Sequence, residues 1–243
     1  MPSITFNDVS SSYYNENTKL KVLALDHFST TFENGKITAI LGENGSGKTT
    51  LIKCICDFVK YEGEILLDDK NIDTLTTRKR NIGYVSQDII LNPKQNVFDN
   101  IAFSLFIQKK KAIEIRQKVY LLAELLKISH LLNRQVDELS KGQQQRVVIA
   151  KALIKDPDIL LLDEPFSNLD KDNKEIIFAL IKEFIKQENR LCIFVTHNTK
   201  DAVFYSDAII EMKDGKLINK VNKNDKDFHL LTDIKDLKET SNA

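Results

Sequence analysis

The sequence predicts an α/β fold built on a mainly parallel sheet with helices on both faces. Apolar runs of buried-strand length recur along the 243 residues, at 37–41, 159–162 and 191–195, and helical patterns lie between them. Strands that alternate with helices are typical of a parallel sheet. A hydrophobic content of 42% supplies a core for one large domain, or for one domain with an inserted subdomain.

The amino-terminal part of the chain is expected to contain short strands and turns. Residues 1–36 alternate between apolar and polar side chains over short stretches, and Asn34-Gly35 is a hairpin-type turn signal. A further strand is expected over residues 61–67. A short buried strand follows over residues 81–86.

From about residue 96 to residue 152 the apolar spacing becomes helical. One apolar stripe with steps of four, three and four residues predicts an amphipathic helix: Ile115, Val119, Leu122 and Leu126. Another helix is expected over residues 174–187. Residues 209–218, with a turn at Asp214-Gly215, are expected to close the fold as a hairpin.

These elements predict one domain over residues 1–222, followed by a short polar tail over residues 223–243. The helical segment, about residues 89–155, interrupts the alternation of strands and helices. We therefore interpret it as a helical subdomain inserted into the α/β core.

A glycine-rich segment joins the first buried strand to a helix and matches the pattern G-x-x-x-x-G-K-[ST]. Glycines let the backbone wrap closely around a phosphate, and the start of the helix offers unpaired N–H groups to the anion. In this motif the Lys48 ammonium reaches the β- and γ-phosphates, and the Thr49 hydroxyl binds Mg²⁺. The residues expected to bind nucleotide here are Gly42, Glu43, Asn44, Gly45, Ser46, Gly47, Lys48, Thr49 and Thr50.

Two carboxylates, Asp163 and Glu164, close the apolar strand at residues 159–162. The carboxyl edge of an open α/β sheet is where such folds place their ligand contacts. Asp163 is therefore a candidate to hold Mg²⁺ through water, and Glu164 is a candidate to polarise or deprotonate an attacking water. The alternative is a surface Asp-Glu turn before Pro165.

Residues 139–146, with the sequence LSKGQQQR, resemble the signature segment of the ATP-binding cassette family, usually written LSGGQ. The resemblance covers roughly residues 4–220. It implies a P-loop NTPase (RecA-like) core with an N-terminal antiparallel β subdomain and an inserted α-helical subdomain. It also implies ATP hydrolysis, with ATP and Mg²⁺ as cofactors.

The resemblance assigns roles to residues at strand ends. Asp163 and Glu164 match the magnesium-holding acid and the catalytic acid of the family. Gln87 matches the Q-loop, which implies contact with Mg²⁺ and a part in catalysis. His197 matches the switch histidine, which as a neutral ring can bond the γ-phosphate and the attacking water.

Tyr13 lies where the family stacks an aromatic ring on adenine. Tyr14 is the alternative, because the insertion at residues 15–22 blurs the register. Sequence reasoning alone leaves these two tyrosines open.

The signature segment implies a second cassette. Ser140 is expected to open a helix whose N–H groups, with Gly142 and Gln143, bind the ATP held by the other subunit. Asp170, at the end of the D-loop (residues 167–170), is assigned to the same nucleotide-binding set. One departure is Lys141, which stands where the family usually has glycine. It is expected to face solvent, and the alternative is that its charge strengthens ATP binding.

Composition excludes several classes of function. Thirty-five basic and thirty-five acidic residues cancel, so there is no basic footprint for nucleic acid. Three cysteines without a CxxC spacing favour reduced thiols that serve as packing residues: Cys54, Cys56 and Cys192. No run of 18 apolar residues and no signal peptide are visible.

The resemblance implies that the chain lies at the cytoplasmic face of the cell membrane, bound peripherally to transmembrane permease subunits. Segments 96–103 and 166–170 resemble ATPase subunits of bacterial importers, which implies an extracellular solute-binding protein as a possible further partner. Only about twenty residues follow residue 222, whereas the larger sugar importers carry a regulatory domain, so the solute class stays open. The alternatives are the ATPase of an exporter or lipid-extraction system, and a soluble cassette protein. The second ATPase chain is either another copy or a paralogue.

Overall fold

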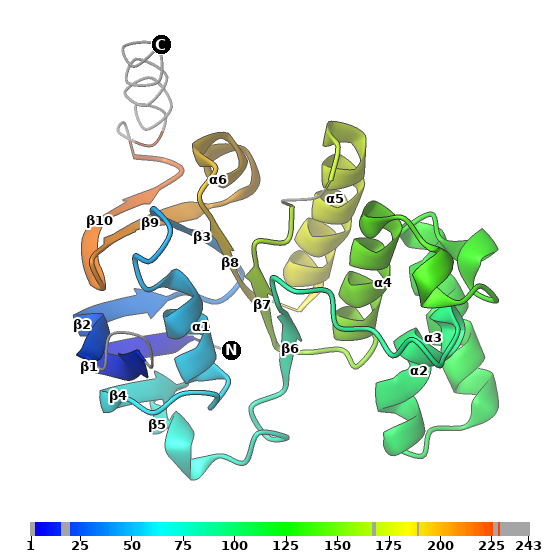
Figure 1. The fold of residues 1–243 in the computed structure, drawn as a ribbon, viewed down its shortest axis with the longest axis horizontal. Helices are drawn as coiled ribbons and strands as arrows, with labels where there is room; N and C mark the ends of the chain where they lie inside the picture. The colour runs from blue at the N-terminus through cyan, green and yellow to red at the C-terminus, as the bar shows by residue number, and fades with distance from the viewer. Residues whose placement is uncertain (1–2, 16–19, 167–168, 189, 226–227, 229–243) are drawn as a thin grey trace.

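The computed structural model describes residues 3–15, 20–166, 169–188, 190–225 and 228. Two sheets organise this part of the chain (Figure 1). A four-stranded antiparallel sheet contains the amino-terminal strands, and a six-stranded sheet crosses the middle of the molecule. The predicted combination of a mainly parallel sheet, an antiparallel part and a helical part is present.

The antiparallel sheet has the strand order β2-β1-β4-β5. Its strands are β1 (Ile4–Asn15), β2 (Leu20–Phe32), β4 (Glu62–Leu67) and β5 (Lys70–Asn71). The prediction of short amino-terminal strands is wrong, because β1 and β2 run for 12 and 13 residues. Register shifts after Phe6 and Val9 break the two-residue alternation that reveals a long strand. The turn at Asn34-Gly35 leads from β2 into the other sheet instead of closing a hairpin.

The central sheet has the strand order β10-β9-β3-β8-β7-β6. Its strands are β3 (Ile37–Leu41), β6 (Ile82–Val85), β7 (Ile159–Asp163), β8 (Leu191–Thr196), β9 (Ala208–Lys213) and β10 (Lys216–Asn222). All neighbours pair in parallel except β9 and β10, which form the predicted hairpin. Every residue of β3, β7 and β8 is buried, as expected when both faces of a parallel sheet are covered.

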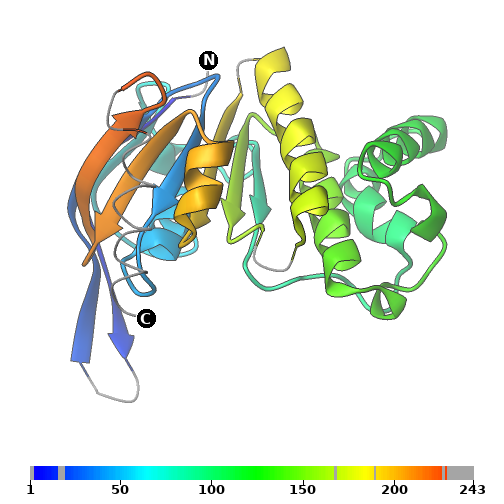
Figure 2. The ribbon, with the colours of Figure 1, turned by 90° about the horizontal axis from the view of Figure 1, so that it is seen from above.

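The helices divide into two groups. The α-helices are α1 (Lys48–Ile55), α2 (Val97–Ile107), α3 (Ala112–Leu125), α4 (Lys141–Leu153), α5 (Lys171–Gln187) and α6 (Thr199–Tyr205), with 3₁₀ turns at Ile72–Thr74, Ser129–Leu131 and Val136–Glu138. Figure 2 shows α2 and α3 at the end of the molecule farthest from the antiparallel sheet, with α4 and α5 in between. The predicted stripe is confirmed: Ile115, Val119 and Leu126 are buried and Leu122 is half-buried.

Two clusters of buried apolar side chains cover opposite faces of the central sheet. Ile37, Ala39 and Leu41 of β3 belong to one cluster, whereas Ile40 belongs to the other, as the alternation of side chains along a strand requires. The three cysteines are buried within these clusters and are free thiols, as predicted. Burial raises the pKa of Cys54 and of Cys56 to about 12, so both thiols stay protonated.

The boundaries of the predicted domains stay predictions. Most of the predicted tail at 223–243 lies outside the described residues. Residues 16–19, which belong to the predicted insertion at 15–22, also lie outside them. Among the described residues, none of the helices combines the length and the apolar character that a membrane span requires.

Candidate functional site

The glycine-rich loop lies between β3 and α1, as the sequence predicts. Gly47 has φ +98° and caps α1 without any side-chain hydrogen bond. A Cβ atom at this position would lie 2.2 Å from the Ala24 carbonyl oxygen, so only glycine fits there. Because α1 also has no acidic residue in its first turn, its first N–H groups face the loop without a side-chain partner at the cap. This arrangement suits a bound anion.

The side chain of Lys48 is folded into the loop. Its ammonium donates to the carbonyl oxygens of Gly42 at 2.8 Å and Glu43 at 2.7 Å. Burial lowers the Lys48 pKa, and the nearby Glu164 and Asp163 carboxylates oppose that effect. The hydroxyl of Ser46 is buried in the same loop and makes no hydrogen bond among the described residues. Phosphate oxygens could therefore replace the two carbonyl oxygens that Lys48 now contacts, and they could accept the hydrogen bond that the Ser46 hydroxyl does not make.

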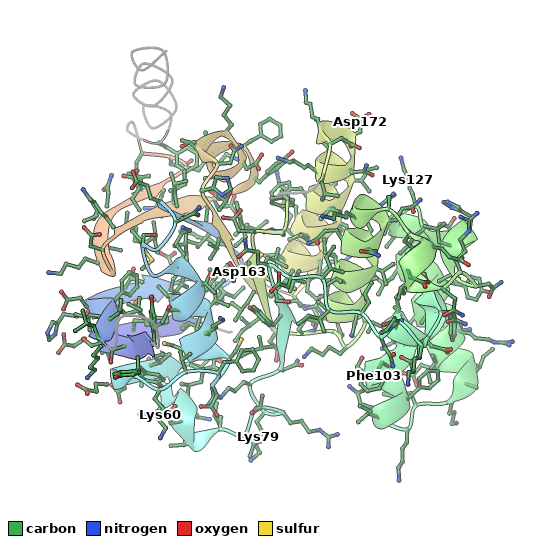
Figure 3. The ribbon with its side chains drawn as sticks, viewed as in Figure 1. Lys60, Lys79, Phe103, Lys127, Asp163 and Asp172 are labelled. Atoms are coloured by element: carbon green, nitrogen blue, oxygen red, sulfur yellow. The ribbon has the colours of Figure 1, made fainter. Side chains whose placement is uncertain are left out.

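Asp163 meets the phosphate loop at the end of β7. The Thr49 hydroxyl donates to Asp163 Oδ1 at 3.1 Å, across 114 residues of sequence. Figure 3 places Asp163 near the centre of the molecule, and its residue exposure is only 1%. Burial raises the Asp163 pKa, and the Thr49 hydrogen bond opposes that rise. A buried carboxylate beside a hydroxyl is an oxygen-donor set of the kind that hard divalent cations prefer.

Glu164 and His197 form a pair at the ends of two neighbouring strands. His197 Nδ1 lies 2.8 Å from Glu164 Oε1. The Glu164 side chain is 10% exposed and that of His197 is 59% exposed. Glu164 has φ +51°, a left-handed conformation that costs a residue with a Cβ atom free energy, and its N–H donates to the Val195 carbonyl. Strain of this kind is frequent at functional sites, and no local pattern in the sequence indicates it.

A cavity of about 310 Å³ opens in front of the loop. The predicted residues that line it are Tyr13, Asn44, Gly45, Gly47, Lys48, Thr49, Thr50, Gln87 and Glu164. Tyr13 lines the cavity and Tyr14 does not, which favours Tyr13 as the aromatic contact. Sequence reasoning missed four residues that also line the cavity: Val22, Leu23, Ala24 and Val195. Val22 pairs with Tyr13 across the β1–β2 hairpin, so it reaches the cavity only through the register of this bulged hairpin.

The signature segment lies outside this cavity. Ser140 caps α4: its hydroxyl accepts from the Gln143 N–H at 3.3 Å, and its own N–H donates to Gln143 Oε1 at 3.0 Å. Asp170 caps α5 in a similar way, and its hydrogen bonds with Asn173 lower the pKa of its carboxyl. Ser140, Gly142, Gln143 and Asp170 do not line the cavity, and residues 167–168 of the D-loop lie outside the described part. Lys141 is exposed, as expected.

Residues 25–167, more than half of the chain, match the family described as ABC transporter. The chain belongs to this family. The prediction made from the signature segment is thereby confirmed.

Curated relatives carry names of import ATP-binding proteins. The molybdate/tungstate import ATP-binding protein WtpC of Methanocaldococcus jannaschii is 45% identical over 180 residues, which is 74% of this chain and 60% of the relative. The glucose import ATP-binding protein GlcV of Saccharolobus solfataricus is 41% identical over 206 residues, 82% of this chain and 58% of the relative. The chain thus spans about three fifths of the length of the curated relatives it matches.

Solved structures of ABC cassettes share the fold. A dimeric structure of MJ0796, a bacterial ABC transporter cassette, gives a TM-score of 0.84 at 27% identity and covers 91% of this chain and 99% of that chain. The structure of cbiO1 from Clostridium perfringens, part of the ABC transporter complex cbiONQ, gives 0.80 at 30% identity over 97% and 93% of the two chains. The predicted P-loop NTPase fold is therefore confirmed.

Proposed function

We propose that this chain is the ATP-binding and ATP-hydrolysing subunit of an ABC transporter that imports a solute. The observation that carries the proposal is the meeting of three elements at one sheet edge: the Lys48 loop, the Thr49–Asp163 hydrogen bond and the Glu164–His197 pair. The names of the relatives, which are import ATP-binding proteins, support import over export.

In this proposal the loop binds the phosphates of ATP. The backbone N–H groups of α1 and the Lys48 ammonium bond the phosphate oxygens, and Tyr13 contacts the base at the other end of the cavity. The Thr49 hydroxyl, the Asp163 carboxylate and the Gln87 amide would hold Mg²⁺. When bound, that ion supplies positive charge that neutralises the phosphates.

Glu164 is the proposed general base. Its carboxylate can accept a proton from the attacking water, and the bond from His197 holds the carboxylate in one orientation. The left-handed backbone at Glu164 turns the chain at the end of β7. The Glu164 side chain then both lines the cavity and contacts His197. Removal of the base should therefore slow the chemical step without weakening the binding of ATP.

Four predicted residues outside the cavity would form the other half of a composite site. Ser140, Gly142 and Gln143 begin α4 at the surface, and Asp170 caps α5. We assign them to the ATP bound by a second cassette, a copy of this chain or a paralogue. The dimeric state of the similar cassette MJ0796, for which a structure with ADP and Pi is known, supports this assignment.

We also propose a docking groove for the permease, which lies after the Q-loop and is lined by Ile89 and Leu91. Ile90 and Phe103 are 66% and 45% exposed, and Ile89, Leu91 and Phe98 are half-buried next to them in sequence. Val97 is fully buried and belongs to the core. Docking there would hold the chain peripherally at the cytoplasmic face of the membrane. An extracellular solute-binding protein would complete the importer.

The dimer test uses Glu164→Gln, which keeps the shape of the side chain and removes the base. ATP should bind and persist, so the variant should become a dimer with ATP and stay a monomer with ADP in size-exclusion chromatography with light scattering. ATP drives closure because it contacts both chains only in the dimer. Ser140→Arg in the same background should restore the monomer. A monomer with ATP at saturating concentration would overturn closure between two copies of this chain.

A further inference from the structure

The turn between α2 and α3 carries a surface that combines exposed apolar and basic side chains. We name it the hairpin patch. Its members are Phe106, Ile107, Ile113 and Tyr120, with Lys109, Lys110, Lys111 and Arg116. Ile107 is 67% exposed and Ile113 is 64% exposed, the two largest values among the apolar side chains of this hairpin. Contiguous exposed apolar side chains of this kind mark interaction surfaces.

The apolar members of the patch lie on both sides of the turn: Phe106 and Ile107 end α2, and Ile113 and Tyr120 lie on α3. Ile113 and Tyr120 lie seven residues apart on α3 and therefore project from the same face, away from the buried Ile115. Ile107 is the last residue of α2. Lys109 follows that helix in the left-handed conformation, at φ +55°, where glycine is usually favoured. Lys109 thus occupies a backbone position at which glycine would cost less free energy.

The charge of this segment is far from that of the whole chain. Residues 103–127 contain six basic and two acidic residues, whereas the chain has a net charge of zero. Glu114 pairs with Lys110 at 3.3 Å and with Lys118 at 3.7 Å. Lys109, Lys111 and Arg116 make no ion pair with any described residue. The patch therefore presents uncompensated positive charge beside apolar side chains.

This combination is what an anionic lipid surface recognises. Lysines next to a negatively charged leaflet are attracted to its headgroups, and exposed apolar side chains can enter the boundary with the acyl chains. The patch is also continuous with the proposed permease groove, since the Phe98 and Tyr120 rings lie 6.3 Å apart. A cassette docked on a membrane-embedded permease would carry the patch toward the membrane surface.

We propose that the hairpin patch binds the anionic lipid headgroups of the membrane that holds the permease. The proposal rests on the proposed function, because it takes the membrane and the docked orientation from it. It adds a second contact to the one made through the permease. This contact depends on lipid charge and on salt, because the attraction falls off within a Debye length.

The test is flotation of the purified full-length chain with vesicles of phosphatidylcholine alone or of phosphatidylcholine mixed with phosphatidylglycerol. The chain should bind the anionic vesicles only, and added salt should release it. The triple variant Lys109→Gln, Lys110→Gln, Lys111→Gln should lose at least about tenfold in binding. The double variant Ile107→Ser, Ile113→Ser should lose binding as well, since both side chains are exposed and their replacement spares the core.

Matched controls remove the same groups elsewhere on the surface. The lysine control variant removes three exposed lysines beside the carboxyl half of α5 and carries the substitutions Lys182→Gln, Lys186→Gln and Lys223→Gln. The apolar control variant, with Leu20→Ser and Ile218→Ser, removes two apolar side chains that are 64% and 60% exposed. Both control variants should bind anionic vesicles as the parent does. Circular dichroism should give the same spectrum for the parent and all four variants.

Three results would overturn the proposal: no binding to either kind of vesicle, equal binding to both, or a loss in the lysine control variant equal to that of the patch variant. Failure of the proposed function would look different. In that case Glu164→Gln would not dimerise with ATP, whatever the vesicles show. The lysine triple variant, placed in the Glu164→Gln background, should dimerise normally, because the patch takes no part in the nucleotide site.

Discussion

Helices α1 and α4 begin alike, with a lysine and with no acidic residue in the first turn. The other described α-helices each have an aspartate or a glutamate there: α2, α3, α5 and α6. A negative side chain in the first turn normally stabilises a helix, because it interacts favourably with the positive end of the helix dipole. A positive lysine at the same place is unfavourable. The two exceptional helices are also the two that the family resemblance assigns to phosphate binding.

The surroundings of the two helix starts differ. Gly47 leaves α1 without a side-chain cap, and Lys48 is 6% exposed within the phosphate loop. At α4 the reciprocal bonds of Ser140 and Gln143 satisfy the cap, and Lys141 is exposed. One helix start is thus prepared for a ligand by its own chain. The other is stable without a ligand and faces outward, as a surface that meets a partner must be.

The largest expected effect separates the two lysines. Lys48→Ala should weaken MgATP binding by about a hundredfold or more, because a charge-assisted bond to the β- and γ-phosphates is lost. Lys141→Ala, the matched control, should leave the affinity of the monomer unchanged. Nucleotide titration of both variants, with circular dichroism as the check on folding, measures the difference. Near-normal affinity in Lys48→Ala would refute the assignment of the loop.

The second effect concerns stability without ligand. Burial raises the Asp163 pKa, so the folded state holds its proton more tightly than the unfolded chain does. The charged carboxylate therefore costs folding free energy at neutral pH, and that cost disappears as the pH falls through the raised pKa. Asp163→Asn should therefore raise the Tm of the nucleotide-free protein at pH 7, and it should abolish Mg²⁺-dependent hydrolysis.

The pH dependence provides the control for this variant. The difference in Tm between Asp163→Asn and the parent should shrink in acid, because the parent carboxyl becomes neutral there. The amide oxygen introduced by Asp163→Asn can still accept the Thr49 hydrogen bond, so a lost bond would not mask the result. A variant that is less stable than the parent at every pH would show that the carboxylate stabilises the empty site.

The parts of the site that sequence reasoning found are those whose chemistry is local. The loop from Gly42 to Thr49 is one continuous motif, and Asp163 and His197 directly follow apolar strands. What it missed depends on contacts between distant segments. Val22 enters the cavity through the register of a bulged hairpin, and the left-handed backbone of Glu164 depends on the neighbouring strand. Neither leaves a trace in spacing or composition.

The smallest expected effect tests the cap of α4. Ser140→Ala removes the hydroxyl that accepts from the Gln143 N–H and should cost about 1 kcal/mol of folding stability, roughly 2–4 °C in Tm. The affinity of the monomer for MgATP should not change, because Ser140 lies outside the cavity that holds Lys48. The ATP-driven dimer of Glu164→Gln should nevertheless weaken, because the same hydroxyl is assigned to the nucleotide of the partner.

Gln143→Ala completes this experiment, because it removes the acceptor of the Ser140 N–H and leaves the hydroxyl in place. The two single variants and the double variant form a double-mutant cycle. The difference between the stability loss of the double variant and the summed losses of the single variants measures the coupling between the two bonds of the cap. Equal Tm values for Ser140→Ala and the parent would mean that the capping box adds nothing to stability. Lower MgATP affinity in the Ser140→Ala monomer would mean that α4 contacts the nucleotide of its own chain. The difference drawn between α1 and α4 would then fail, since both helix starts would serve one cavity.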